Sequence, residues 1–127
     1  MRRPFLLLAA VALLAGGSLA IGAVARNISP LDAMALLTQR QQLFLLDVRT
    51  PEEYRQARLD GAHLIPVDQV VRRLAEIPRD RPVLVYCAVG SRSAQVFNYL
   101  ARQGYPEVYN LEGGIYEWAA QGYPIRR

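Results

Sequence analysis

The sequence predicts an α/β fold, a parallel sheet of about five strands with helices on both faces. Short apolar runs typical of buried strands alternate along the chain with segments that carry helix-start signals. This alternation favours parallel pairing, because each helix returns the chain across one face of the sheet to the start of the next strand. The length of 127 residues fits one domain of this kind.

The elements follow in order from their end signals. The first helix starts at a Ser29 cap, with Pro30 in its first turn, and runs to about Arg40. Residues 43–48 form a continuous apolar run, which indicates a strand buried on both faces. The capping box Thr50-Pro51-Glu52-Glu53 opens the second helix. The remaining expected elements are strands at 63–65, 82–86 and 107–110, and helices at 68–75, at 92–102 and from Gly113-Gly114 to near Gly122.

Residues 1–25 are predicted to be a signal peptide or a membrane anchor, and residues 26–127 the folded domain. Arg2 and Arg3 precede a run of 22 uncharged residues, which is long enough to cross a bilayer of about 30 Å. The run contains two small-x-small triplets typical of signal cleavage sites, Ser18-Leu19-Ala20 and Ala23-Val24-Ala25. Both alternatives predict an exported domain, periplasmic or on the outer face of the cytoplasmic membrane. It would touch the membrane only through an uncleaved N-terminal segment.

Composition excludes several function classes. A hydrophobic fraction of 52% with 20% charged residues excludes a disordered polyelectrolyte. Arginine supplies all 15 basic residues against 11 acidic ones, and no basic run exceeds two residues, so we expect no nucleic-acid partner. The single cysteine, Cys87, and the single histidine, His63, exclude an internal disulfide and a cysteine- or histidine-rich metal site. No metal and no cofactor are therefore expected.

The segment around Cys87 carries the candidate chemistry. Cys87 directly follows the predicted strand 82–86, and ligands of parallel sheets bind beyond the carboxyl ends of the strands. A short loop that leads into a helix can turn its backbone N–H groups inward, which favours a bound anion and a reactive thiolate. The alternative is a buried, inert cysteine. The loop consists of Ala88, Val89, Gly90, Ser91, Arg92 and Ser93.

Four motifs follow one another along the chain: residues 47–54, Gly61-Ala62 with Ile65-Pro66, residues 87–93, and Leu111-Glu112-Gly113-Gly114 with Trp118, Gly122 and Pro124. In these motifs and their order, the sequence resembles the single-domain rhodaneses, a family of sulfurtransferases, over essentially all of residues 27–125. The chain departs from the family at Ala57-Arg58, where members usually carry Gly-His, and at Asp60, often Pro. These positions lie away from the Cys87 loop in sequence, and the fold prediction is unchanged.

The resemblance implies a mechanism in two displacement steps. The Cys87 thiolate would attack the outer sulfur of a donor such as thiosulfate, and sulfite would leave a persulfide on Cys87. Cyanide or a thiol would then remove that sulfur, which is covalent catalysis with ping-pong kinetics. Ser91, Arg92 and Ser93 are candidate ligands of the donor and the persulfide, although Ser93 could equally be a helix cap.

Asp47 and Arg49 are expected to support the loop. Asp47 ends an apolar strand, where an unpaired carboxylate would be destabilising. A structural pair with Arg49 is therefore favoured over a direct part in the chemistry. Packing or solvated positions are expected for His63, Trp118, Tyr116, Tyr123, Glu52 and Glu53.

Two rival functions share the candidate cysteine. A cysteine-dependent phosphatase or arsenate reductase needs a longer loop with arginine at the sixth position after the cysteine, whereas here Arg92 is the fifth and Ser93 the sixth. A sulfur carrier or binding module of the same fold is the second rival. The expected partners are a small sulfur donor and a thiol or cyanide acceptor, with an acceptor protein as a further alternative.

Overall fold

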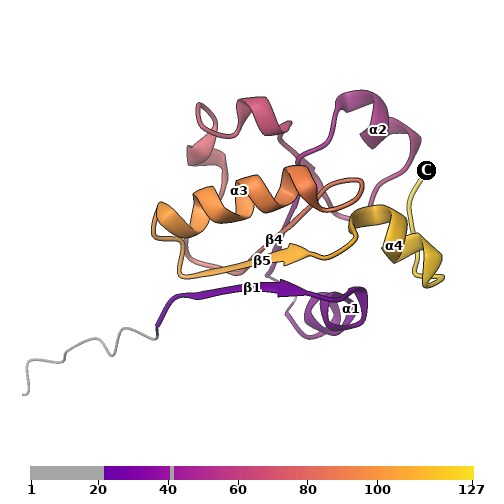
Figure 1. Ribbon diagram of the computed structural model, residues 1–127, viewed down its shortest axis with the longest axis horizontal. Helices are drawn as coiled ribbons and strands as arrows, with labels where there is room; N and C mark the ends of the chain where they lie inside the picture. Colours follow the sequence, from indigo (N-terminus) through magenta and orange to yellow (C-terminus); the bar gives the residue numbers. More distant parts are fainter. Residues whose placement is uncertain (1–21, 41) are drawn as a thin grey trace, which may run out of the picture.

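The computed structural model describes residues 22–40 and 42–127, which form a five-stranded parallel sheet (Figure 1). The strand order is β1-β5-β4-β2-β3. The strands are β1 (Val24–Ile28), β2 (Phe44–Asp47), β3 (His63–Leu64), β4 (Val83–Tyr86) and β5 (Glu107–Leu111). The predicted fold class is therefore confirmed, and the expected N-terminal segment lies outside the described residues up to residue 21. Within the described ranges, no helix is both long enough and apolar enough to cross a membrane.

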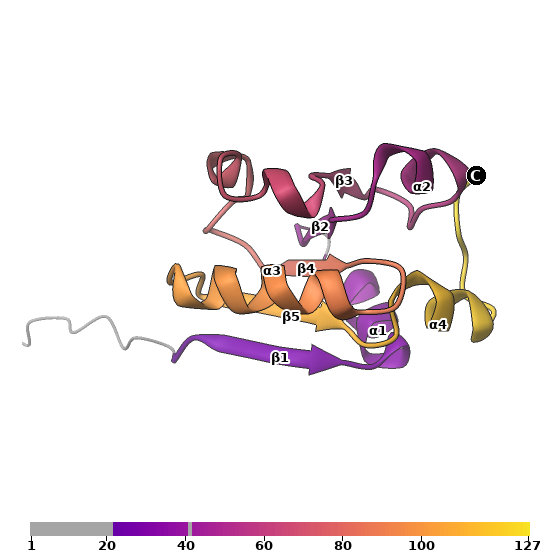
Figure 2. The same cartoon turned by 45° about the horizontal axis from the view of Figure 1, so that its top comes forward.

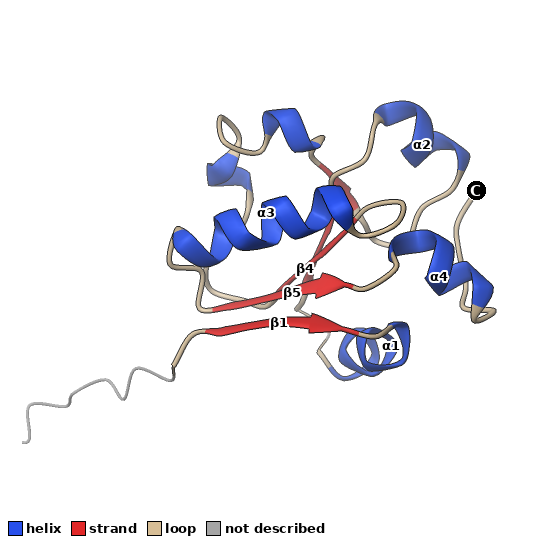
Figure 3. Cartoon of the chain, viewed as in Figure 1, coloured by secondary structure: helices blue, strands red, loops and turns tan. Residues whose placement is uncertain are grey.

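Among the described residues, three α-helices and two short 3₁₀ helices connect the strands, and a fourth α-helix follows the last strand (Figure 3). The α-helices are α1 (Pro30–Gln39), α2 (Pro51–Gln56), α3 (Ser91–Arg102) and α4 (Gly114–Ala120), and the 3₁₀ helices are η1 (Val67–Gln69) and η2 (Leu74–Glu76). The expected caps form, because Ser29 Oγ accepts the Asp32 N–H at 3.1 Å. Thr50 and Glu53 likewise complete the capping box of α2.

Alternating side chains of the central strands build a core on each face of the sheet. Leu46, Val83 and Val85 point to the face covered by α3 and the 3₁₀ helices. Leu45, Leu84 and Tyr86 point to the opposite face, where they pack with side chains of α1 and α4. Figure 1 shows α3 and α1 on opposite sides of β5 and β1, and Figure 2 shows the same elements turned by 45°. Burial on both faces explains why β2 and β4 are continuous apolar runs.

Two elements differ from the sequence prediction. β1 was not predicted, because of its five residues only Ile28 is buried. Its strand conformation comes from pairing with β5, which begins at Val24 opposite Glu107. Residues 68–75 form no single helix, because i→i+3 hydrogen bonds such as Gln69 N–H to the Pro66 carbonyl give 3₁₀ turns instead.

Candidate active site

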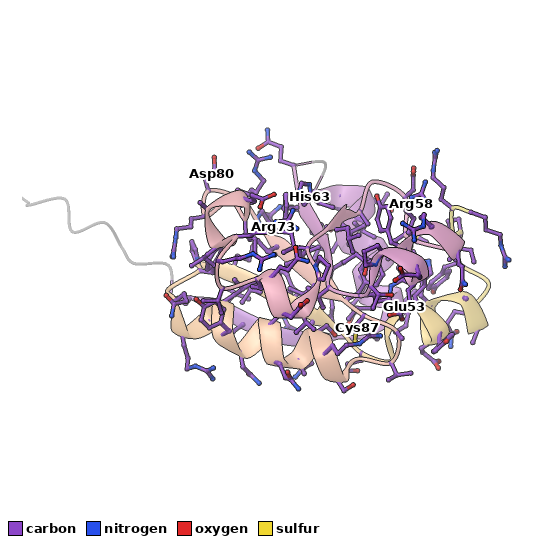
Figure 4. All side chains as sticks on the ribbon, turned by 90° about the horizontal axis from the view of Figure 1, so that it is seen from above. Glu53, Arg58, His63, Arg73, Asp80 and Cys87 are labelled. Carbon is purple, nitrogen blue, oxygen red and sulfur yellow. The ribbon has the colours of Figure 1, made fainter. Side chains whose placement is uncertain are left out.

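Cys87 lies at the carboxyl edge of the sheet, immediately after the central strand β4. The side chain is fully buried. Figure 4 labels Cys87 near the point where the loop after β4 enters α3, and Glu53 of α2 in the same region of this view. The structure thus places Cys87 at the edge of the sheet that the sequence predicts for it.

The loop directs several hydrogen-bond donors at the Cys87 sulfur. The Gly90 N–H donates to Sγ at 3.1 Å and the Ser93 N–H at 3.3 Å. Ser93 Oγ lies 3.3 Å from Sγ and also 3.2 Å from the Gly90 carbonyl oxygen, so its single proton can serve either acceptor. When Cys87 is ionised, the hydroxyl proton is drawn to the sulfur, because charge-assisted hydrogen bonds are the stronger ones.

These donors determine the protonation of Cys87. Burial raises the pKa of the thiol, because it removes water from the charged form. Hydrogen bonds from the Ser93 hydroxyl and from the Ser93, Gly90 and Val89 amides oppose this effect, and the pKa of Cys87 is lowered overall from its ordinary value. The loop therefore favours the thiolate, which is the nucleophilic form of cysteine.

A glycine produces the sharp turn at the start of α3. Gly90 has φ +103° and occupies the N-cap position of the helix, a conformation that other residues rarely adopt. A side chain at Gly90 would also begin 3.4 Å from the Gly113 nitrogen. Both features let the loop fold tightly around Sγ. Ser93, three residues later, is a sulfur ligand and not the helix cap.

The first turn of α4 holds the start of the loop through backbone hydrogen bonds. The Ile115 N–H donates to the Cys87 carbonyl at 2.9 Å, and the Tyr116 N–H donates to the Ala88 carbonyl at 3.2 Å. Gly114 has φ +60°, and a Cβ there would lie 2.4 Å from the Ala88 oxygen. With both carbonyls held against α4, the amides that follow them can face the sulfur. The sequence pattern at Gly113-Gly114 predicts a helix start, but it carries no local signal of this contact.

A buried network of hydrogen bonds joins Asp47, at the end of β2, to Arg49 and to Tyr86, at the end of β4. The Arg49 guanidinium donates to the Asp47 carboxylate at 2.7 Å from Nη2 to Oδ2, and from Nε at 3.0 Å to Oδ1 and 3.2 Å to Oδ2. Tyr86 Oη donates to Asp47 Oδ2 at 2.7 Å and accepts the Leu59 N–H at 3.1 Å. Burial, together with the Asp47 charge, raises the pKa of Tyr86, so the phenol remains a donor. The predicted structural pair of Asp47 and Arg49 is confirmed, and neither side chain contacts Sγ among the described hydrogen bonds.

Arg92 is paired with an acidic residue of α2. Its Nη1 and Nη2 donate to the two carboxylate oxygens of Glu53, at 2.8 and 2.9 Å. The Arg92 hydrogen bonds lower the pKa of Glu53 to about 2. The expectation that Glu53 is merely solvated is therefore wrong. The ion pair ties α2 to α3 and holds the Arg92 guanidinium close enough to Cys87 for their charges to interact.

A cavity of about 240 Å³ adjoins the Cys87 loop. Ala88 of the loop forms part of its wall, together with Gln56 of α2, the C-cap residue Ala57, and Ile115 and Tyr116 of α4. Ala57 thus borders the same cavity as the loop, although the two are far apart in sequence. The cavity could hold a small organic molecule beside the loop.

The other residues named in the sequence analysis are either exposed to solvent or packed in the core. Val89 and Ser91 are exposed, and no described hydrogen bond joins the Ser91 side chain to Sγ. His63 is also exposed, with its ring against Phe44 and Nε2 3.6 Å from Glu76, and no described hydrogen bond joins it to the loop. Trp118 is buried and packs edge-to-face on Tyr123, as predicted. Tyr116, by contrast, is 67% exposed and borders the cavity.

Comparison with known proteins decides the family. The model of the rhodanese-like domain matches residues 29–121. The chain belongs to the rhodanese-like domain family. Among curated relatives, a sulfurtransferase of Allochromatium vinosum is 44% identical over 89 residues, which is 70% of this chain and 83% of the relative. The thiosulfate sulfurtransferase GlpE of Vibrio cholerae is 31% identical over 94 residues, 74% of this chain and 89% of the relative.

Solved rhodanese-like structures have the same fold. A rhodanese-related protein from Thermoplasma volcanium superposes with a TM-score of 0.73 at 31% identity, covering 80% of this chain and 97% of the other. A rhodanese-like domain protein from Staphylococcus aureus gives a TM-score of 0.70 at 30% identity, covering 80% and 99%. The relatives support a general sulfurtransferase role for this rhodanese-like domain. Within the described ranges, it shows no cluster of three or more metal-ligating side chains.

Proposed function

We propose that this rhodanese-like domain transfers a sulfane sulfur through a persulfide on Cys87. The convergence of the Gly90 and Ser93 donors on Sγ is the observation that carries the proposal. These donors stabilise negative charge on sulfur, first on the attacking thiolate and then on the persulfide. The relatives in Allochromatium vinosum and Vibrio cholerae are named as sulfurtransferases, which supports the same function for this chain.

In the first step, the thiolate attacks the outer sulfur of thiosulfate. The S–S bond of the donor breaks, sulfite leaves with the electron pair, and Cys87 carries the transferred sulfur as an anionic persulfide. In the second step, cyanide or a thiol attacks the outer sulfur, and the electron pair of the broken bond returns to Cys87. No external oxidant or reductant is required, and the sequence of steps predicts ping-pong kinetics.

Arg92 supports this chemistry by its position. Its guanidinium charge lies near Cys87 and is held in place by Glu53. Glu53 takes two of the five N–H donors of Arg92, so the guanidinium is held in one position and keeps donors for an anionic donor molecule. The short loop, with Arg92 at the fifth position after Cys87, favours sulfur transfer over a phosphatase or arsenate reductase. Arg92→Ala should lower kcat/KM for thiosulfate more than it lowers stability, and an unchanged kcat/KM would remove Arg92 from the mechanism.

Mass spectrometry of the intact protein tests the proposal. Treatment with thiosulfate, without an acceptor, should add one sulfur atom to the chain, and cyanide should remove it. Cys87→Ser and iodoacetamide pretreatment should each abolish the adduct. Turnover of thiosulfate by Cys87→Ser at the rate of the unmodified protein would refute the mechanism. An adduct that forms but reaches no small acceptor would instead favour a sulfur carrier that serves an acceptor protein.

We also propose that residues 1–25 direct export, as a signal peptide or an anchor. The uncharged run after Arg3 and the two small-residue triplets support this proposal. Strand β1 discriminates between the triplets, because cleavage after Ala25 would remove Val24 and Ala25 from their pairing with β5. Cleavage after Ala20 would leave β1 whole. N-terminal sequencing of the protein from its native host tests this, and intact Met1 in the soluble cytosol would contradict export.

A further inference from the structure

We infer that the amino edge of the sheet is a membrane-contact surface, which places the domain against anionic phospholipid headgroups and points Cys87 away from the bilayer. The amino edge is the set of residues that precede or begin the strands: 22–23, 40, 42–43, 77–82 and 102–107. The inference rests on the proposed export of the chain, with the N-terminal segment retained as an anchor. It goes beyond sulfur transfer, because it concerns how the domain is oriented on the membrane.

The connection between the uncharged run and the fold is very short. The run that follows Arg3 ends at Ala25, whereas β1 begins at Val24 and pairs with Glu107 from that first residue. Residues 4–21 still number 18, which is enough for a membrane span of about 17–25 residues. Residues 22 and 23 then remain as the connection, and two residues extend at most about 7 Å. A retained anchor therefore holds the amino edge, where β1 begins, at the bilayer surface.

Arginine is in excess at the amino edge. Within the described ranges, neither Arg79 nor Arg102 pairs with a carboxylate. Arg40 and Arg81 form ion pairs within the edge, but their side chains remain 47% and 43% exposed. Each arginine near an anionic membrane surface favours binding. In all, the edge has four arginines against two carboxylates: Arg40, Arg79, Arg81 and Arg102 against Asp80 and Glu107.

A groove of about 420 Å³ lies at the amino edge, at the point where β1 enters the fold. Val24 forms part of its wall, together with Arg40, Arg79 and Arg81. The guanidinium group of arginine presents a planar fork of donors that matches the oxygens of a phosphate. The groove can therefore hold the phosphate groups of the lipids that surround the anchor.

The opposite edge, which carries Cys87, has the reverse balance of charge. The turns that follow β1, β2, β4 and β5 are residues 29–32, 48–53, 87–93 and 112–117, and they contain two arginines against five carboxylates. The partial charges at helix ends, about half a unit each, reduce this contrast but do not reverse it. In Figures 1 and 2, β1 starts at the end of the molecule opposite to α2 and α4. An anionic bilayer thus attracts the amino edge and repels the edge of the candidate site.

This orientation turns the candidate site toward the aqueous phase. β4 begins at Val83 of the sheet, and Cys87 follows four residues later, which corresponds to about 13 Å along the strand. Water-soluble donors and acceptors would then reach Cys87 without entering the layer of lipid headgroups.

Fluorescence quenching by labelled lipids tests the orientation. The full chain with Cys87→Ser is reconstituted into vesicles of one part phosphatidylglycerol to two parts phosphatidylcholine, and it carries a fluorophore on a cysteine introduced by Gln42→Cys or by Gln121→Cys. Gln42 is exposed at the amino edge, and Gln121 is exposed at the end of α4. A nitroxide on the lipid headgroups should quench the probe at position 42 and leave the probe at position 121 bright. Equal quenching of the two probes would overturn the assignment.

Arginine substitutions separate the effect of charge from that of the short connection. Arg81→Gln and Arg102→Gln should each lower the ratio of quenched to unquenched probe at position 42 about fivefold, as should be expected for the loss of one surface arginine. Vesicles of phosphatidylcholine alone should lower the same ratio. Arg55→Gln is the matched control, because Arg55 is an exposed arginine of α2, paired with Glu52 away from the amino edge. Equal effects of Arg55→Gln and Arg102→Gln would show that the arginines of the amino edge do not contact the lipids.

The outcomes separate this inference from the proposals on the function of the chain. Docking is measured in a Cys87→Ser chain, so it does not depend on sulfur transfer, and reconstitution does not depend on export. With Cys87 intact, Arg102→Gln should form the persulfide at the rate of the unmodified protein. Docking without a persulfide would reject the sulfurtransferase alone, and a persulfide without oriented docking would reject this inference alone. A mature N-terminus at Ile21 in the native host would reject the anchor, and the orientation with it.

Discussion

Replacing Ser93 with alanine should raise the pKa of Cys87 and change its alkylation rate in a pH-dependent way. The substitution removes one donor, the hydroxyl 3.3 Å from Sγ, and leaves the Gly90 and Ser93 amide donors in place. A hydrogen bond to a charged group contributes about 1.5–3 kcal/mol. Sulfur is a weak acceptor and the distance is long, so we use the lower end of that range. About 1.4 kcal/mol corresponds to a tenfold change in the thiolate fraction below the pKa.

The assay is the rate of Cys87 alkylation by iodoacetamide as a function of pH. At low pH, Ser93→Ala should react about threefold more slowly than the unmodified protein, since about tenfold less thiolate is present but each thiolate is about threefold more nucleophilic. At high pH, where both are fully ionised, the variant should react about threefold faster, because a thiolate of higher pKa is more nucleophilic. The two curves should therefore cross. A variant that had merely lost its loop structure would gain or lose reactivity at every pH.

Ser91→Ala is the control for this experiment. Ser91 belongs to the same helix, two residues before Ser93, but it is exposed. Its alkylation curve should superimpose on that of the unmodified protein. If Ser93→Ala also superimposes, or if both variants shift equally, the Ser93 hydroxyl does not stabilise the thiolate and the account of the loop is wrong.

Three further predictions concern the support of the loop, each measured by chemical denaturation. Gly114→Ala should lower the free energy of unfolding by about 3 kcal/mol, because the new Cβ would clash with the Ala88 carbonyl. Gly122 has a similar φ but open space around it, so the control Gly122→Ala should lower the free energy of unfolding by only about 1 kcal/mol. Glu53 has a folded-state pKa of about 2 against an ordinary 4.5, so the stability that it contributes is complete above pH 4.5 and lost as the pH falls toward 2. Glu53→Gln should remove about 1 kcal/mol at pH 7, after allowance for solvent screening, and should flatten this acid limb. Tyr86→Phe removes two buried hydrogen bonds and should destabilise by about 2 kcal/mol, whereas no loss would show that the network is not required.

Much of the fold and of the candidate site was predictable because its signals are local. The apolar runs at 43–48 and 82–86 indicate strands buried on both faces, since two apolar faces leave no polar alternation. The caps at Ser29 and Thr50 mark helix starts through side chains that satisfy nearby amides. Cys87 follows a buried strand directly, and the topology of parallel sheets then places it at the ligand-binding edge. These inferences need only neighbouring residues and one general rule of topology.

Other features depend on contacts between residues far apart in the chain, which no local pattern encodes. β1 forms because its backbone pairs with β5, about 80 residues later, while its own side chains are mostly exposed. Glu53 resembles a solvated residue of α2 until folding brings it within 3 Å of Arg92. The contact between α4 and the loop was not predictable either, because backbone amides form its hydrogen bonds and the side chains therefore give no signal of it. Gly114 contributes only by lacking a Cβ that would clash with Ala88. The sequence by itself determined which residue is the candidate nucleophile and which edge of the sheet carries it. Tertiary structure decided how the loop is held around the sulfur, since that depends on hydrogen bonds and steric fit between segments that meet only in the folded chain.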